Sequence, residues 1–110
     1  MLYPTHSVAS VLAVTGSYAT SVSCLGFKDR AEDGVFDASV SRWRNDLSNE
    51  SALFSTADGG IMRINEFRRV GIAPERPEVR LSMYGTAGAF EQQTAGAVWQ
   101  TRDGCETCAN

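Results

Sequence analysis

The first residue that could do chemistry is His6, which is the only histidine of the chain. It lies two residues after Pro4. Histidine ordinarily changes charge near neutral pH, so it is the side chain best suited to general acid or base catalysis. If a helix begins here, the positive end of its dipole disfavours a charged imidazole. His6 is therefore a candidate general base, and the alternative is an ordinary surface or capping residue.

A second group of candidates is formed by Glu66, Arg68 and Arg69, at the end of a run that looks like a strand. A carboxylate beside guanidinium groups could bind a hydroxylated or an anionic substrate through charge-assisted hydrogen bonds. The alternative is ordinary ion pairing on the protein surface, which contributes little to stability.

The cysteines form a third, weaker candidate. Cys105 and Cys108 have the CxxC spacing, and Cys24 lies far away in the sequence. A structural zinc site needs four ligands, and a redox CxxC normally opens a helix after a strand. We expect reduced thiols on an incidental C-terminal tail and no metal, with metal binding or redox work as the alternative.

Several classes of function are disfavoured. The segment Gly85-Thr-Ala-Gly88 lacks the G-x-G-x-x-G spacing, so we expect this chain alone to bind no nucleotide cofactor. A net charge of −3 argues against nucleic acid as a partner. The longest apolar run, near Val8 to Val14, is far shorter than the roughly 20 residues of a membrane span. Because the first residues also lack a basic leader, we expect a cytoplasmic protein.

The elements that would position these candidates follow from periodicity. Val8, Val11 and Leu12 recur at helical spacing, which predicts an amphipathic helix over residues 6–15, and Gly16 is placed to end it. Alternation over residues 18–27 predicts a strand. Residues 28–49 are charged and aperiodic, which predicts a long, partly packed loop.

A β-hairpin is the clearest local prediction. Two strand-like runs within residues 52–67 flank Asp58-Gly59, a typical hairpin turn. If these two residues form the turn, Leu53 faces Ile64 and Ser55 faces Met62. Phe54 then shares the other face with Arg63, Asn65 and Phe67.

Further strands are expected around residues 79–84, 89–91 and 97–101. At 110 residues the chain has the usual size of one domain with one core. The predicted fold class is α+β: an N-terminal helix followed by a mainly antiparallel open sheet, with helix on one face.

Five segments together resemble the C-terminal domain of the Gfo/Idh/MocA (glucose–fructose oxidoreductase, inositol dehydrogenase and MocA-like) family. The similarity covers residues 1–93, and residues 94–110 form a poorly assigned tail. The resemblance lies in the order and spacing of the segments, which are Tyr3–Ser7, Ser23–Gly26, Ser48–Phe54, Met62–Arg69 and Met83–Gly88.

The resemblance implies the substrate and oligomerisation portion of an NAD(P)-dependent sugar or polyol oxidoreductase, lacking its Rossmann domain. His6 would be the catalytic histidine that faces the nicotinamide and assists proton transfer. Tyr3, Glu66, Arg68 and Arg69 would bind substrate. NAD(P) would be held by a Rossmann domain supplied in cis or in trans, and homo-oligomers are expected.

Two alternatives stay open. Leu2 stands where many dehydrogenases of this family have an aspartate, and the Tyr-Pro-Thr-His run resembles a branch that includes NAD-dependent glycosidases. The chain could instead be a non-enzymatic module that self-associates through an apolar sheet face with Phe54, Ile61 and Phe67.

Overall fold

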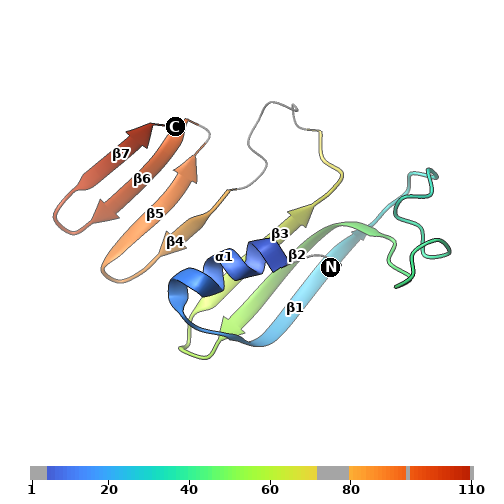
Figure 1. The fold of residues 1–110 in the computed structure, drawn as a ribbon, viewed down its shortest axis with the longest axis horizontal. Coiled ribbons are helices and arrows are strands. Elements are labelled where there is room, and N and C mark those ends of the chain that lie inside the picture. Colours follow the sequence, from blue (N-terminus) through green and yellow to red (C-terminus); the bar gives the residue numbers. More distant parts are fainter. Residues whose placement is uncertain (1–4, 72–79, 94, 110) are drawn as a thin grey trace. The chain divides into compact units, whose positions relative to one another are not determined.

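The computed structural model describes residues 5–71, 80–93 and 95–109 (Figure 1). In these ranges one helix is followed by two open antiparallel sheets of three and four strands, with strand orders β1-β2-β3 and β4-β5-β6-β7. The fold is therefore mainly β, and the antiparallel character predicted from the sequence is confirmed. The elements are α1 (Thr5–Thr15), β1 (Ala19–Lys28), β2 (Leu47–Thr56), β3 (Ile61–Phe67), β4 (Ser82–Tyr84), β5 (Gly88–Gln93), β6 (Gly96–Thr101) and β7 (Cys105–Ala109).

The chain divides into two compact units, residues 1–70 and 71–110, and each unit holds one of the sheets. The sequence had predicted a single sheet, so this is a correction. Hairpin alternation reveals which strands are antiparallel neighbours, but it does not show whether successive hairpins join in one sheet. The described helix is too short to cross a membrane.

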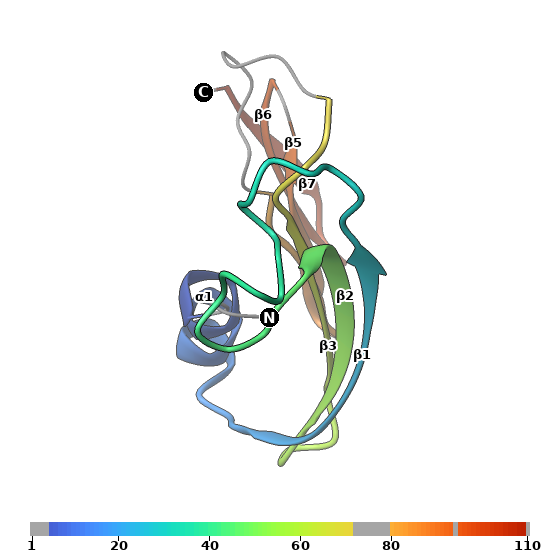
Figure 2. The ribbon, with the colours of Figure 1, turned by 90° about the vertical axis from the view of Figure 1, so that its right-hand side faces the viewer.

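Helix α1 forms where the apolar spacing predicted it. Ser7, Val8, Val11 and Leu12 are half-buried, while the side chains between them are exposed. Gly16 ends the helix in the left-handed conformation, with φ 65°, and its N–H donates to the carbonyl of Leu12 at 2.9 Å. The helix lies across one face of the β1–β3 sheet and contacts β3 (Figure 2).

The strand predicted over residues 18–27 is confirmed as β1. All ten residues of β1 are exposed. The strand lies at the sheet edge, and the contacts of α1 are made with β3 instead. The sequence pattern therefore identified the strand, whereas its burial depended on where the helix packs.

The β2–β3 hairpin is confirmed, but its predicted register is wrong by one residue. Leu53 pairs with Arg63, Phe54 with Met62, and Ser55 with Ile61. The turn is longer than the two residues assumed, because Thr56 N donates to Gly60 O at 3.0 Å and Gly59 takes a φ of 84°. A three-residue loop with a left-handed glycine is the next most common hairpin connection.

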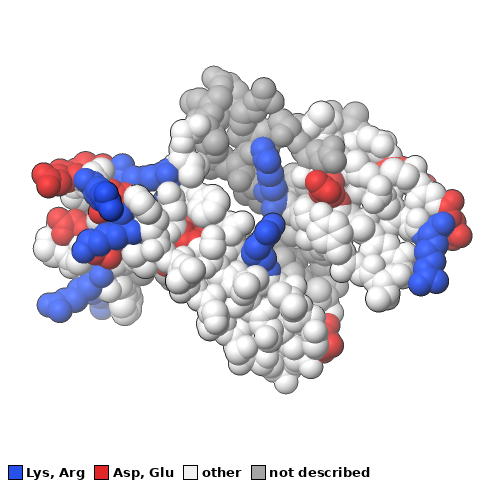
Figure 3. All heavy atoms as spheres, turned by 180° about the vertical axis from the view of Figure 1, so that it is seen from behind, with Lys and Arg blue, Asp and Glu red and all other residues white. Residues whose placement is uncertain are grey.

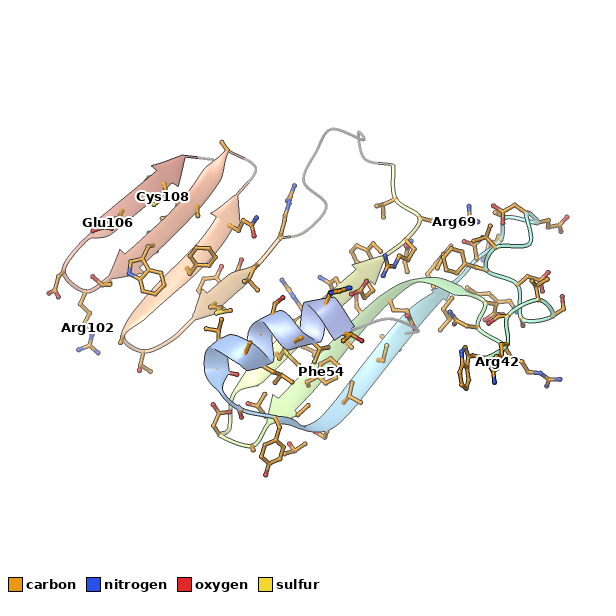
Figure 4. All side chains as sticks on the ribbon, viewed as in Figure 1. Arg42, Phe54, Arg69, Arg102, Glu106 and Cys108 are labelled. Carbon is orange, nitrogen blue, oxygen red and sulfur yellow. The ribbon has the colours of Figure 1, made fainter. Side chains whose placement is uncertain are left out.

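This register decides which side chains meet the helix. Phe54 lies beneath α1 with Met62 and Ile64, rather than on the outer face with Phe67 (Figure 4). The buried apolar side chains of the described residues are Ala52, Met62 and Ile64, each at most 4% exposed. The core of the first unit is thus a thin layer between the helix and the inner face of β2 and β3.

The second unit contains a strand that the sequence prediction missed. Residues 97–101 were expected to form the last strand, followed by a frayed tail. Instead, β7 pairs along its whole length with β6. Phe90 and Trp99 lie opposite each other on β5 and β6, with ring centroids 6.3 Å apart.

Gly88 should be essential to the pairing of β5 with β6. A Cβ at this position would lie 2.6 Å from the backbone carbonyl oxygen of Gln100, closer than real contacts allow. We expect Gly88→Ala to destabilise the second unit by about 1–3 kcal/mol, because the backbone of β5 or β6 must shift to make room for the methyl group. Hydrogen exchange of the β5 and β6 amides measures this. Gly104→Ala, where a Cβ meets nothing within 4 Å, is the control, and equal protection in both variants would contradict the prediction.

Candidate functional site

The start of α1 is held against the end of β3. Ser7 donates a short hydrogen bond from Oγ to Oε1 of Glu66. Ser7 is half-buried, and the side chain of Glu66 is only 13% exposed. His6 is the preceding residue of the helix and is exposed. Two predicted site residues from distant parts of the sequence are therefore brought to the same end of the sheet.

Arg68 completes this contact. Its Nη2 lies 3.1 Å from Oε2 of Glu66, and its own side chain is 54% exposed. Glu66 is thus bound by a hydroxyl on one oxygen and by a guanidinium on the other. An ion pair this exposed adds little to stability, but it holds the carboxylate in one orientation.

Sequence reasoning missed Glu50. This residue lies directly opposite Glu66 in the β2–β3 ladder and is only 6% exposed. Carboxylates are seldom buried, and like charges directly opposite each other on neighbouring strands are destabilising. The ladder therefore places two carboxylates directly opposite each other on the inner face of the sheet.

Ser48 lies on the same side of β2, two residues before Glu50. It is the most buried side chain described, at 2% exposed, and among the described residues its Oγ has no hydrogen-bond partner. Arg68 N donates to the carbonyl of Ser48 at 3.0 Å, which places the two residues side by side. We call the set of Ser7, Ser48, Glu50, Glu66 and Arg68 the carboxylate cluster.

Arg69 is directed to a different place from Arg68. Its Nε lies 2.7 Å from Asp29 and its Nη2 lies 2.5 Å from Asp33, and the guanidinium stacks 5.2 Å from the centre of the Phe36 ring. Its backbone exchanges two hydrogen bonds with the side chain of Asn49. Arg69 therefore links residues 29–46, the loop between β1 and β2, to the end of β3 (Figure 4). Its guanidinium is engaged by residues of this loop.

Removing the contacts of the Arg69 side chain should make the 29–46 loop more mobile. We expect Arg69→Gln to raise the rate of tryptic cleavage after Arg42 and Arg44, because the loop loses two ion pairs and a stacking contact. Arg68→Gln is the matched control, since its partner is Glu66. Identical cleavage rates in the two variants would show that Arg69 does not hold the loop.

The ion pair between Arg69 and Asp33 should also make the order of the loop depend on pH. The hydrogen bond from Arg69 lowers the pKa of Asp33 below its ordinary value. A carboxyl whose pKa is lower in the folded state stabilises the fold above its unfolded pKa, and the contribution disappears as the pH falls through the folded pKa. NMR relaxation of loop amides should therefore show order at pH 7 that is lost below about pH 4. The control is Arg69→Gln, in which the loop should change little over this range.

The remaining candidates lie elsewhere. Tyr3 falls outside the described residues. Cys105 and Cys108 are exposed, free thiols in β7. Residues three apart on a strand point to opposite faces, so these two thiols are not arranged to chelate one ion. Within residues 5–71, 80–93 and 95–109, no group of three or more histidine, cysteine or acidic side chains could hold a metal.

The carboxylate cluster can accept hydrogen bonds from several hydroxyl groups, because carboxylate oxygens accept more than one donor each. The exposed imidazole of His6, on the helix that covers the cluster, belongs to the residue type that most often accepts a proton in catalysis. Comparison with known proteins gave no match to this chain among family models, curated proteins or solved structures.

Proposed function

We propose that the first unit is the substrate-side portion of an NAD(P)-dependent sugar or polyol oxidoreductase of the Gfo/Idh/MocA type. The observation that carries the proposal is the contact of Ser7 with Glu66, which sets the helix start that bears His6 against a buried pair of carboxylates. The proposal also agrees with the order of the five sequence segments that resemble this family. The exposed, unpaired cysteines fit the cytoplasmic location proposed with it.

The residues of this chain have distinct roles in the proposed reaction. Glu66 and Glu50 accept hydrogen bonds from substrate hydroxyls and orient the carbon to be oxidised. His6 takes the proton of the reacting hydroxyl while the hydride leaves from the same carbon. The chemistry supplied by NAD(P)⁺ is hydride acceptance, and the nucleotide is held by a Rossmann domain in cis or in trans. Proton and hydride together account for the two-electron oxidation of an alcohol to a carbonyl.

The cofactor half of the proposal can be tested by calorimetry. The 110-residue chain should bind neither NAD⁺ nor NADP⁺, because its sequence has no glycine-rich phosphate loop. When a Rossmann domain is supplied, sugar-dependent reduction of NAD(P)⁺ should appear. Micromolar binding of either nucleotide to the isolated chain would contradict the proposal that a separate Rossmann domain binds the cofactor.

A specific observation favours a second function, self-association. On the outer face of the β1–β3 sheet five large apolar side chains are at least half exposed: Leu25, Phe27, Leu53, Ile61 and Phe67. Seen from behind, much of the surface is uncharged (Figure 3). Apolar patches of this kind mark association sites. The face differs from the one expected from sequence, because Phe54 lies on the inner side.

Light scattering over a concentration series tests this function. We expect an oligomer that Phe67→Ser weakens, because the substitution puts a hydroxyl into the apolar patch. Val35→Ser, at a comparably exposed apolar residue of the 29–46 loop, is the matched control. A strict monomer at high concentration would rule out the self-associating module.

A further inference from the structure

Strand β1 forms one edge of the first sheet (Figure 1). In the described sheet its only neighbour is β2, and all ten of its residues are exposed. In an antiparallel pair the backbone groups of alternate residues point toward the partner strand, and those of the other residues point away from it. The outward-directed N–H and C=O groups of β1 can therefore pair with a further strand.

The sequence of β1 does not protect this edge. Edge strands are usually kept from pairing by charged side chains, by proline or by being very short. β1 is ten residues long, and residues 19–27 contain no charged residue and no proline. The charged residue of the strand, Lys28, lies at its end, and its Nζ is 2.9 Å from the carboxylate of Asp46. The middle of the edge is therefore open to another chain.

The regular part of the edge has a defined centre. Register shifts occur between Ala19 and Ser21 and between Phe27 and Lys28, so residues 21–27 form the uninterrupted segment. Cys24 is the midpoint of this segment. An antiparallel match of the segment with itself, about a two-fold axis at Cys24, pairs all of its residues. A second copy of the chain is thus a partner that fits the whole regular length of the edge.

The side chains also suit a pair of this kind. A two-fold axis perpendicular to the sheet reverses the strand direction and keeps like faces on the same side. On the inner face, Val22, which is 56% exposed, would lie opposite Gly26 of the second copy. The side chain of Leu47 lies over Gly26, where it occupies the space that a Cβ would need. Val22 would therefore exchange water for an apolar contact with Leu47.

The first unit would gain buried apolar area from such a pair. Its described residues bury only three apolar side chains, whereas Val22, Leu25 and Phe27 of β1 are each more than half exposed. Domains of this size have small cores, and oligomerisation is a common way to stabilise them. Closed two-fold dimers are the commonest oligomers, so a two-fold dimer is the assembly to expect.

We infer that two copies of the chain pair through β1 about a two-fold axis at Cys24, so that their three-stranded sheets join into one continuous sheet with both helices on the same face. This inference rests on the proposed self-association, because it names the strand through which the copies join. The edge contact is separate from the outer-face contact that involves Phe67. It brings the exposed Leu25 and Phe27 of both copies into one larger apolar surface.

The test uses the Phe67→Ser chain, in which the outer-face contact is weakened and the edge contact is left intact. Sedimentation over a concentration series should still show a dimer. Amide hydrogen exchange is then measured by NMR at low and at high concentration. Exchange should slow at alternate residues of 21–27 as the dimer forms, because only those N–H groups point away from β2. Packing through a sheet face would not give this alternation.

Two lysine variants of the same chain locate the contact. Cys24→Lys puts like charges directly opposite each other at the two-fold axis and should raise the dissociation constant of the dimer about fivefold or more. Asn65→Lys adds the same charge at an exposed residue of β3, on the other side of β2, and should leave the constant unchanged. The exchange measurement keeps the test valid if Cys24→Lys does not fold.

The outcomes separate the edge contact from self-association in general. A dimer whose β1 amides exchange at the same rate at every concentration, or a Phe67→Ser chain that is monomeric, would overturn the edge contact and leave association through the outer face in place. A strict monomer of the unaltered chain would count against both. Equal weakening of the dimer by Cys24→Lys and Asn65→Lys would also overturn the edge contact.

Discussion

Replacing Ile64 with alanine is expected to destabilise the first unit by about 2–5 kcal/mol. Ile64 is 4% exposed and is one of three buried apolar side chains among the described residues. A small domain has a total stability of roughly 5–15 kcal/mol, so a cavity in a core this thin removes a large part of it. Chemical denaturation followed by the amide signals of β2 and β3 measures the loss.

Ile61→Ala is the matched control for this prediction. Ile61 belongs to the same strand but points to the outer face and is 82% exposed. Its replacement should change the stability by less than about 0.5 kcal/mol. If the two variants were equally destabilised, the assignment of inner and outer faces to β3 would be wrong.

If the proposed oxidoreductase is assembled with a Rossmann domain, replacing His6 with alanine is expected to lower its turnover by about 10²–10⁴-fold, the usual contribution of a positioned general base. The stability of the chain should hardly change, because His6 is exposed. The pH profile of kcat should also lose the limb that reports deprotonation of the base. Steady-state kinetics with the Rossmann domain present measure both effects.

Thr15→Ala is the control on the same helix, because Thr15 is exposed and its hydrogen bonds are local, to the carbonyls of Val11 and Leu12 and from the N–H of Ser17. It should retain turnover and the full pH profile. If His6→Ala retained both as well, His6 would have no part in proton transfer, and the proposed reaction would lose its base.

The local elements could be predicted because their signals are short-range. Val8, Val11 and Leu12 specify the helix, and Gly16 specifies its end. The hairpin register could not be predicted, since Asp58-Gly59 is compatible with turns of two or three residues. One residue of difference moved Phe54 from the outer face to the core.

The site was only partly accessible to sequence reasoning. Glu50 is in phase with Ala52 and Phe54, which lie on the inner face, but a polar residue in a strand is ordinarily assumed to face water. The pairing of Arg69 with Asp29 and Asp33 spans most of the first unit and leaves no local pattern. β7 was missed because Cys105-Glu-Thr-Cys108 has little apolar alternation.

The central claim is that the start of α1 and the inner face of β2 and β3 form a sugar or polyol site. It is tested most directly by mapping amide NMR shifts while a panel of neutral sugars and polyols is titrated into the 110-residue chain. The account predicts saturable shifts centred on Ser7, Glu50 and Glu66, which Glu66→Gln weakens. Shifts confined to residues 80–109, or none at any concentration reached, would contradict it.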